Sequence, residues 1–247
     1  MWNSETLTGR SEAHLVPAPA ELDGRDDRSS PFLLHPGAVS ELATLREAGL
    51  ARGIDLKVAS GFRPFARQRS IWNRKVSGEL KLRNRAGEVV SPRDFAPAAL
   101  LELLSTWSAL PGASRHHWGT DVDVFDAAAR PEGYEVQLVP EEYAPGGPFA
   151  KLGAWLDELA AAPGFAFARP YFGGEGKKGR RACPVAPEPW HLSARSPARG
   201  AQEHYDPAVL RALLADPAPG EEIALADEVL ADFEGYFREW ILSGFVS

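Results

Sequence analysis

The 247-residue sequence contains a single cysteine, Cys183, so no disulfide bond can form within the chain and a reducing compartment is the simpler expectation. We expect this cysteine to pack against neighbouring side chains or to lie in a loop. The first thirty residues lack the apolar stretch of a signal peptide, and no later run has the length of a transmembrane helix. The sequence therefore predicts a cytoplasmic protein without a membrane partner.

A basic excess is also missing, because the formal net charge is −7. Nucleic-acid binders need a basic face that replaces phosphate counterions, so this class is not expected. The acidity is concentrated in residues 201–247, which contain ten acids and two arginines. This tail either covers an active-site cleft or forms a solvated pair of helices, and we favour the second interpretation.

Residues 63–85 have the opposite balance, with eight cations and one acid. Such a local field suits an anionic small substrate. A solvated helix face and loop, however, accounts for most of these charges.

The length and the hydrophobic content of 44% suit one globular enzyme domain, and the sequence has no internal repeat. We divide the chain into an N-terminal extension (1–39), a catalytic domain (40–195) and an acidic helical extension (196–247). Helices and strands follow one another without strict alternation, which predicts an α+β fold with a small antiparallel sheet and packed helices. The expected helices cover 40–51, about 64–76, 97–107, 148–159, a segment opened by Asp206 and Pro207, and 221–242; the expected strands cover 54–60, 121–124, 165–169 and 190–193, with a loop at 173–184.

The segment SRHHWGTDVDVFD (114–126) places histidines just before alternating aspartates. As a strand, residues 121–124 send Asp121 and Asp123 to one face and both valines to the other. Gly119 lets the preceding loop turn, so that His116 approaches Asp123. One imidazole and one carboxylate suit zinc, but two ligands do not complete a site, and capping or packing explains most such pairs.

A third ligand is available in PEPWHLS (187–193), where His191 follows Glu188 by three residues. Pro189 favours an extended Glu188, whose carboxylate is long enough to act as a base on a zinc-bound water without binding the metal. The alternative for this motif is an edge strand anchored by Trp190 that carries an ordinary glutamate.

Three motifs in this order, SGFR with a glutamine five residues later, SxHxxGTDxD and EPWH, resemble the D-alanyl-D-alanine carboxypeptidase family of zinc peptidases. The resemblance covers about residues 40–195 and extends to VanY-like carboxypeptidases and VanX-like dipeptidases. It implies the hedgehog-type α+β fold and one zinc ion per chain. It also implies zinc ligands at His116, Asp123 and His191, a catalytic base at Glu188, a substrate-polarising arginine at Arg63, and substrate-pocket positions at Ser60, Gln68 and Ser114.

Other positions depart from the family pattern or vary within it. Asp121 stands where the family often has alanine, and it either orients a ligand or stays solvated. His117 falls on a variable position, either behind the ligands or on the surface. The segment between the two metal motifs (167–187) also differs from the common pattern, which concerns substrate contacts and not the zinc chemistry.

The resemblance implies a peptidase that removes a terminal D-amino acid from muropeptides by attack of a metal-activated water. One alternative is an endolysin-type L-alanyl-D-glutamate endopeptidase, although no wall-binding repeat follows the catalytic region. Another is an inactive, zinc-stabilised binding protein of the same fold. The presence of both Glu188 and Arg63 argues against this last alternative, because a structural zinc site needs neither.

Overall fold

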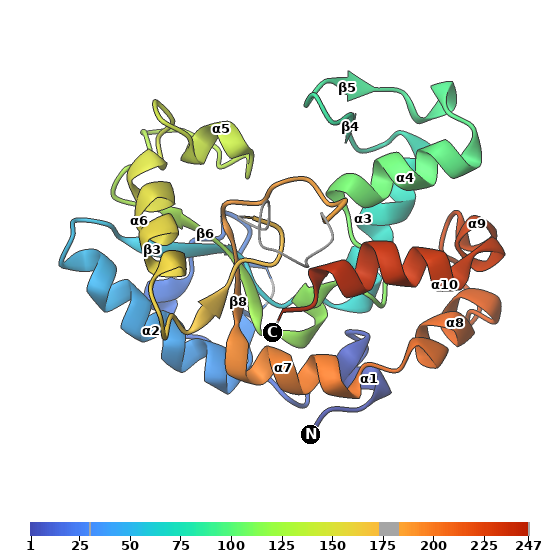
Figure 1. The fold of residues 1–247 in the computed structure, drawn as a ribbon, viewed down its shortest axis with the longest axis horizontal. Coiled ribbons are helices and arrows are strands. Elements are labelled where there is room, and N and C mark those ends of the chain that lie inside the picture. The colour runs from blue at the N-terminus through green and yellow to red at the C-terminus, as the bar shows by residue number, and fades with distance from the viewer. Residues whose placement is uncertain (30, 173–182, 247) are drawn as a thin grey trace.

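The computed structural model describes residues 1–29, 31–172 and 183–246 (Figure 1). Its centre is a four-stranded antiparallel sheet in the order β3-β6-β8-β7. The strands are β3 (Leu56–Ser60), β6 (Asp121–Asp126), β8 (His191–Ala194) and β7 (Phe167–Ala168). The predicted α+β class and its small antiparallel sheet are confirmed.

Helices pack on this sheet and extend beyond it. The longer ones are α2 (Pro36–Leu50), α3 (Phe65–Ser77), α4 (Pro97–Trp107), α6 (Ala150–Ala161), α7 (Arg195–His204) and α8 (Pro207–Ala215). The short elements are α1 (Ser4–Leu7), α5 (Pro140–Tyr143), α9 (Ala226–Ala231), α10 (Phe233–Tyr236) and the small strand pairs β1–β2 (Val16–Pro17, Leu33–Leu34) and β4–β5 (Leu82–Arg83, Val89–Val90).

Local sequence explains several helix ends. Asp206 caps α8 by accepting a hydrogen bond from the backbone NH of Ala208, and Pro207 occupies the first helical position, as expected. Helix α2 begins four residues before the predicted start, because Nδ1 of His35 accepts from Gly37 NH and Pro36 opens the helix. Helix α3 ends at Gly78, whose φ of 85° is the left-handed conformation that glycine adopts readily.

Two hydrophobic clusters hold the fold together. The first lies between the sheet and helices α2 and α6, and it contains the inward valines of β3 and β6, which confirms the predicted alternation along β6. The second combines side chains of α3, α4, α8 and the C-terminal residues with Leu7 from the N-terminal segment. In Figure 1 the sheet with α2 and α6 stands on one side and α3, α4 and α8 to α10 on the other. The division of the chain into three segments stays a prediction.

The C-terminal tail differs from the expectation. The predicted single helix over 221–242 is wrong: α9 ends before Asp232, whose carboxylate accepts from Gly235 NH and starts α10, and a π-helical turn (Phe237–Ile241) follows. Helix α7 was not expected either. The solvated helical pair is also wrong, since Phe233 and Phe237 belong to the second cluster.

No helix among the described residues combines the length and the apolar character that a bilayer crossing needs.

Candidate metal and substrate site

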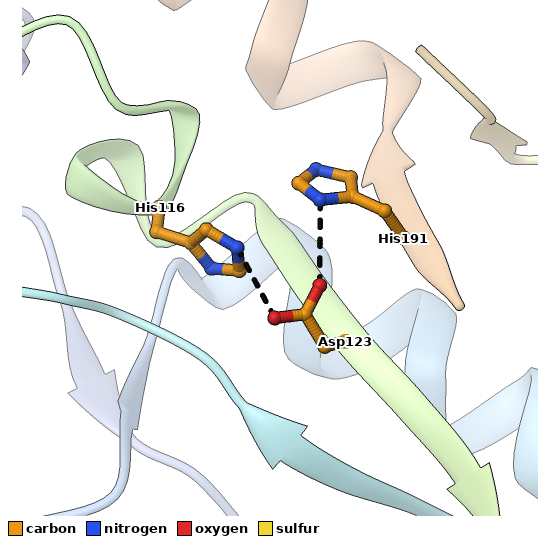
Figure 2. Close-up of side chains that lie close together, drawn as sticks. All are labelled: His116, Asp123 and His191. Carbon is orange, nitrogen blue, oxygen red and sulfur yellow. Dashed lines mark ion pairs between the residues drawn. The ribbon is translucent and has the colours of Figure 1, made fainter. Parts of the chain in front are cut away.

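Three predicted metal ligands meet at one end of the sheet (Figure 2). His116 lies in a 3₁₀ turn (Arg115–Trp118) that ends at Gly119, whose φ is 65°. A side chain at Gly119 would be strained and would press against Leu15, so glycine is required there. Asp123 and His191 are cross-strand partners on β6 and β8. Asp123 Oδ2 lies 3.3 Å from His116 Nε2, and Asp123 Oδ1 lies 3.3 Å from His191 Nδ1.

The hydrogen bonds of the two rings leave the facing nitrogens available. His116 donates from Nδ1 to Gly61 O at 2.9 Å, and His191 donates from Nε2 to Asp121 Oδ1 at 3.0 Å. In the neutral form that metal binding requires, His116 Nε2 and His191 Nδ1 therefore carry lone pairs. Asp123 Oδ1 is buried and has no hydrogen-bond donor among the described residues. Such an orphaned buried oxygen is costly unless a cation binds it, so the residues present fit a divalent metal ion.

The carboxylates around His191 favour a positive charge on its ring. Burial would lower the pKa of His191, but Asp121, Asp123 and Glu188 raise it well above its usual value. Burial would likewise raise the pKa of Asp123, but His116 and His191 hold it far below its ordinary range. Asp123 thus stays ionised, as a metal ligand must be.

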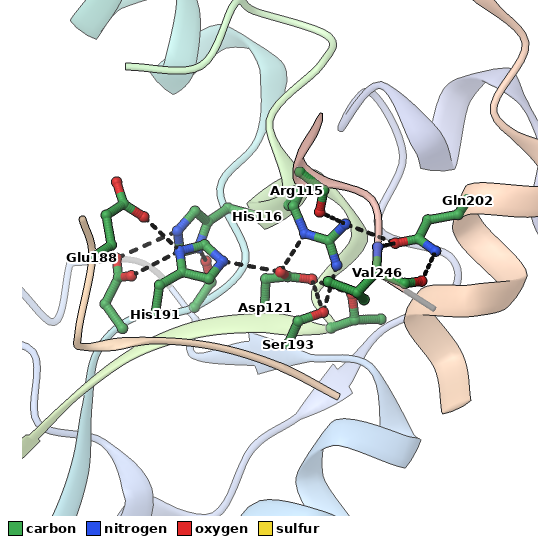
Figure 3. A network of polar contacts seen from close by, with 12 residues as sticks. Arg115, His116, Asp121, Glu188, His191, Ser193, Gln202 and Val246 are labelled. Atoms are coloured by element: carbon green, nitrogen blue, oxygen red, sulfur yellow. Dashed lines mark hydrogen bonds and ion pairs between the residues drawn. The ribbon is translucent and has the colours of Figure 1, made fainter. Parts of the chain in front are cut away.

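Asp121 is fully buried and orients His191, which excludes the solvated alternative (Figure 3). It also accepts from Arg115 Nε at 2.7 Å, from Thr120 Oγ1 at 2.6 Å and from Ser193 Oγ at 3.2 Å. These partners hold the pKa of Asp121 well below its usual value although burial opposes them. A fixed carboxylate behind a metal-binding histidine sets the tautomer and direction of its ring.

Arg115 connects Asp121 with the end of the chain. Its guanidinium donates to Ser193 Oγ at 2.5 Å, to Gln202 Oε1 at 2.9 Å and to Gly244 O at 3.1 Å. Gln202 in turn exchanges two hydrogen bonds with the backbone of Val246 (Figure 3). Arg115 was not identified in the sequence analysis. An arginine next to His116, followed six residues later by Asp121 where the family often has alanine, is nevertheless a signal for a buried ion pair.

The predicted base and the predicted arginine lie in the same site. Glu188 Oε2 is 3.1 Å from His191 Nδ1, and the Glu188 side chain keeps 17% of its surface exposed. Arg63 donates to Ser60 Oγ at 2.8 Å and to Gln68 Oε1 at 2.9 Å, while Gln68 donates to the Ala109 carbonyl. Ser60 and Gln68 therefore fix the Arg63 guanidinium.

His117 is completely buried, so the surface alternative for this residue is wrong. Its Nδ1 donates to Arg63 O at 2.6 Å, and its Nε2 accepts from Gly112 NH at 3.1 Å. Burial lowers the pKa of His117 to about 3, so the ring is neutral. His117 lies behind the ligands and holds the backbone of Arg63.

These side chains surround one cavity of about 350 Å³. The predicted site residues that line it are Arg63, Gln68, Ser114, His116, Asp123, Glu188 and His191. Ser60 lies behind them and accepts a hydrogen bond from Arg63. The C-terminal tail forms part of the wall with Tyr236, Trp240, Ile241 and Phe245, so the interpretation that we did not favour, coverage of the cleft, describes the tail better. Most of the predicted loop at 173–184 lies outside the described residues.

Comparison with known proteins gives matches over this region. The family model for VanY, D-alanyl-D-alanine carboxypeptidase, matches residues 31–195. Two uncharacterized proteins of Haemophilus influenzae are similar: one is 37% identical over 137 residues (56% of this chain, 96% of that protein), and the other is 35% identical over 106 residues (43% and 68%).

Solved structures also align with the chain. A mutant of the vancomycin-resistance D,D-pentapeptidase VanY in complex with Zn(II) is 24% identical with a TM-score of 0.45, covering 76% of this chain and 86% of that one. The LD-carboxypeptidase LdcB is 19% identical with a TM-score of 0.49, covering 92% and 78%. Because the family match spans more than half of the sequence and includes the three residues of the candidate metal site, the chain belongs to the D-alanyl-D-alanine carboxypeptidase (VanY) family.

Proposed function

We propose that this protein is a zinc-dependent carboxypeptidase or dipeptidase that removes a terminal D-amino acid from peptidoglycan-derived peptides. The observation that carries the proposal is the convergence of His116, Asp123 and His191 in a cavity that Glu188 and Arg63 also line. Two nitrogens and one carboxylate oxygen are a donor set that suits zinc and leaves a coordination position open, so we propose one zinc ion per chain.

Zinc, when bound, would lower the pKa of a water molecule toward neutrality and polarise the scissile carbonyl. Glu188 is close enough to the ligands to accept the proton from that water and then to pass it to the departing amine. Arg63, held by Ser60 and Gln68, would bind the substrate near the carbonyl and stabilise the negative charge that develops on its oxygen. Ser114 lines the cavity and is proposed as a substrate contact.

The inactive binding protein accounts less well for these contacts. A site that only binds metal needs no carboxylate beside an open ligand position and no arginine held by two hydrogen bonds within the same cavity. The chain also places a neutral, buried His117 behind Arg63, which adds to the positioning of that arginine.

Defined tetrapeptide and pentapeptide muropeptides, incubated with the zinc-loaded protein and followed by mass spectrometry, test the proposal. We expect loss of one C-terminal residue. Glu188→Gln should retain the wild-type zinc content and lose at least about 10²-fold in turnover, whereas Glu141→Gln, an exposed acid outside the cavity, should change neither. Cleavage at an internal bond would establish the endopeptidase alternative, and a zinc-loaded protein that cleaves none of the panel would establish the binding protein.

A further inference from the structure

A group of cations lines the cavity on the side formed by α3 and β4. Gln68, Ile71 and Lys75 follow one face of α3 at helical spacing, and all three line the cavity. The Lys75 side chain is partly buried and donates to Ser108 Oγ. Burial and the nearby Arg63 lower the pKa of Lys75 to about 8, so its ammonium is still charged at neutral pH but has lost much of its hydration.

Lys81 and Arg83 bring two further cations to the same wall. They flank Leu82, which is 1% exposed and belongs to the second hydrophobic cluster. Lys81 directly precedes β4 and Arg83 lies in it. Because side chains alternate along extended backbone, both point away from the side of Leu82, and both line the cavity. The hairpin is fixed in place, since Trp107 on α4 donates to the carbonyl of Asn84 at 3.2 Å.

Within the described part of the chain, these cations have no carboxylate partner. Among the described residues, no acidic side chain lies within ion-pair distance of Lys75, Lys81 or Arg83. The carboxylates that line the cavity, Asp123 and Glu188, are engaged with the histidines of the metal site. Lys75 and Arg83 are partly buried and Lys81 is exposed. Cations gathered on one wall of a cavity are stabilised by an anion that enters with the substrate.

We propose that Lys75, Lys81 and Arg83 form an anion subsite that binds a side-chain carboxylate of the substrate peptide, on a residue near the cleaved bond. The inference rests on the proposed function and extends it: Arg63 serves the reacting carbonyl, and the three cations select peptides that contain an acidic residue. A diamino dicarboxylic acid such as diaminopimelate has this carboxylate, and lysine is the matched residue that lacks only it.

The experiment compares two pentapeptides that differ only in diaminopimelate or lysine at the third position. A charge-assisted hydrogen bond contributes about 1.5–3 kcal/mol, so the wild type should prefer the diaminopimelate peptide by roughly 10- to 100-fold in kcat/KM. The double variant Lys81→Gln/Arg83→Gln, and separately Lys75→Met, should reduce that preference toward unity. Arg93→Gln, an exposed cation outside the cavity, is the matched control and should keep the preference.

Calorimetric binding of the same two peptides to the zinc-loaded Glu188→Gln protein separates this inference from the proposed function. If the wild type cleaves neither peptide, the proposed function fails, but tighter binding of the diaminopimelate peptide that the double variant abolishes still supports the subsite. Equal affinity of the two peptides for the Glu188→Gln protein with all three cations present would overturn the proposed subsite. A preference that survives in both the double variant and Lys75→Met would overturn it as well.

Discussion

Replacement of Asp121 tests how the protein holds its candidate zinc ligand. In Asp121→Ala, His191 loses the acceptor that lies 3.0 Å from Nε2, so neither the tautomer nor the ring orientation is fixed. Loss of such a partner typically weakens metal binding by about 10- to 100-fold. We therefore expect zinc affinity to fall by that factor while His116, Asp123 and His191 all remain.

The same substitution also affects folding, because it leaves Arg115 without its counterion at 3% side-chain exposure. Removing one partner of a buried ion pair costs about 3–5 kcal/mol. In the double variant Arg115→Met/Asp121→Ala no unpaired charge is left, so its unfolding free energy should lie above that of Asp121→Ala. Its zinc affinity should stay low, since the acceptor for His191 is still missing.

Two measurements separate these effects. Competition with a chromophoric chelator gives the zinc affinity, and urea unfolding in excess chelator gives the stability of the metal-free protein. Asp121→Asn provides an intermediate case, because the amide oxygen can still accept from His191 but has no charge. Wild-type zinc affinity in Asp121→Ala would refute the argument that this carboxylate positions the ligand.

Three further predictions follow from other parts of the structure. His191→Ala should lose most bound zinc by elemental analysis, whereas His204→Ala, at an exposed position, should keep it. Full zinc retention in His191→Ala would contradict the assigned metal site. Trp240→Ala should raise KM for muropeptides without changing zinc content, because Trp240 lines the cavity, and the exposed neighbour Leu242→Ala serves as control. Burial, followed by the charge of His35, lowers the pKa of His14 to about 4 from 6.5, so the unfolded chain binds more protons between these values and stability falls as pH drops through this window. Unfolding curves of chelated His14→Gln should show a smaller loss over pH 6.5 to 4 than the wild type, and parallel curves would contradict the assignment.

The candidate metal site could be predicted from the sequence because its determinants are local. The alternation of Asp121 to Val124 specifies which side chains share a strand face, and Gly119 allows the turn that returns His116 toward Asp123. The pairing of Asp123 with His191 is not local, and only the three-motif resemblance brought those strands together before the structure placed them in register.

The cap of α8 was equally predictable, since Asp206 and Pro207 act on their own first turn. The break at Asp232 was not, because an apolar pattern continues through it while the carboxylate hydrogen-bonds locally and interrupts the helix. Tertiary packing of Phe233 and Phe237 then determines how the shortened helices lie.

The surroundings of the site depend on contacts between distant parts of the chain, for which composition is a poor guide. Arg115 contacts Gly244 across more than a hundred residues, and this contact brings the end of an acidic tail to the metal site. The charge of that tail predicted solvation, yet burial follows the aromatic side chains between its acids, which pack on α3 and α4. Lys75 and Lys81 likewise resemble ordinary surface charges in the sequence. They share a position on the cavity wall because α3 and the β4 hairpin contribute Trp72 and Leu82 to one hydrophobic cluster.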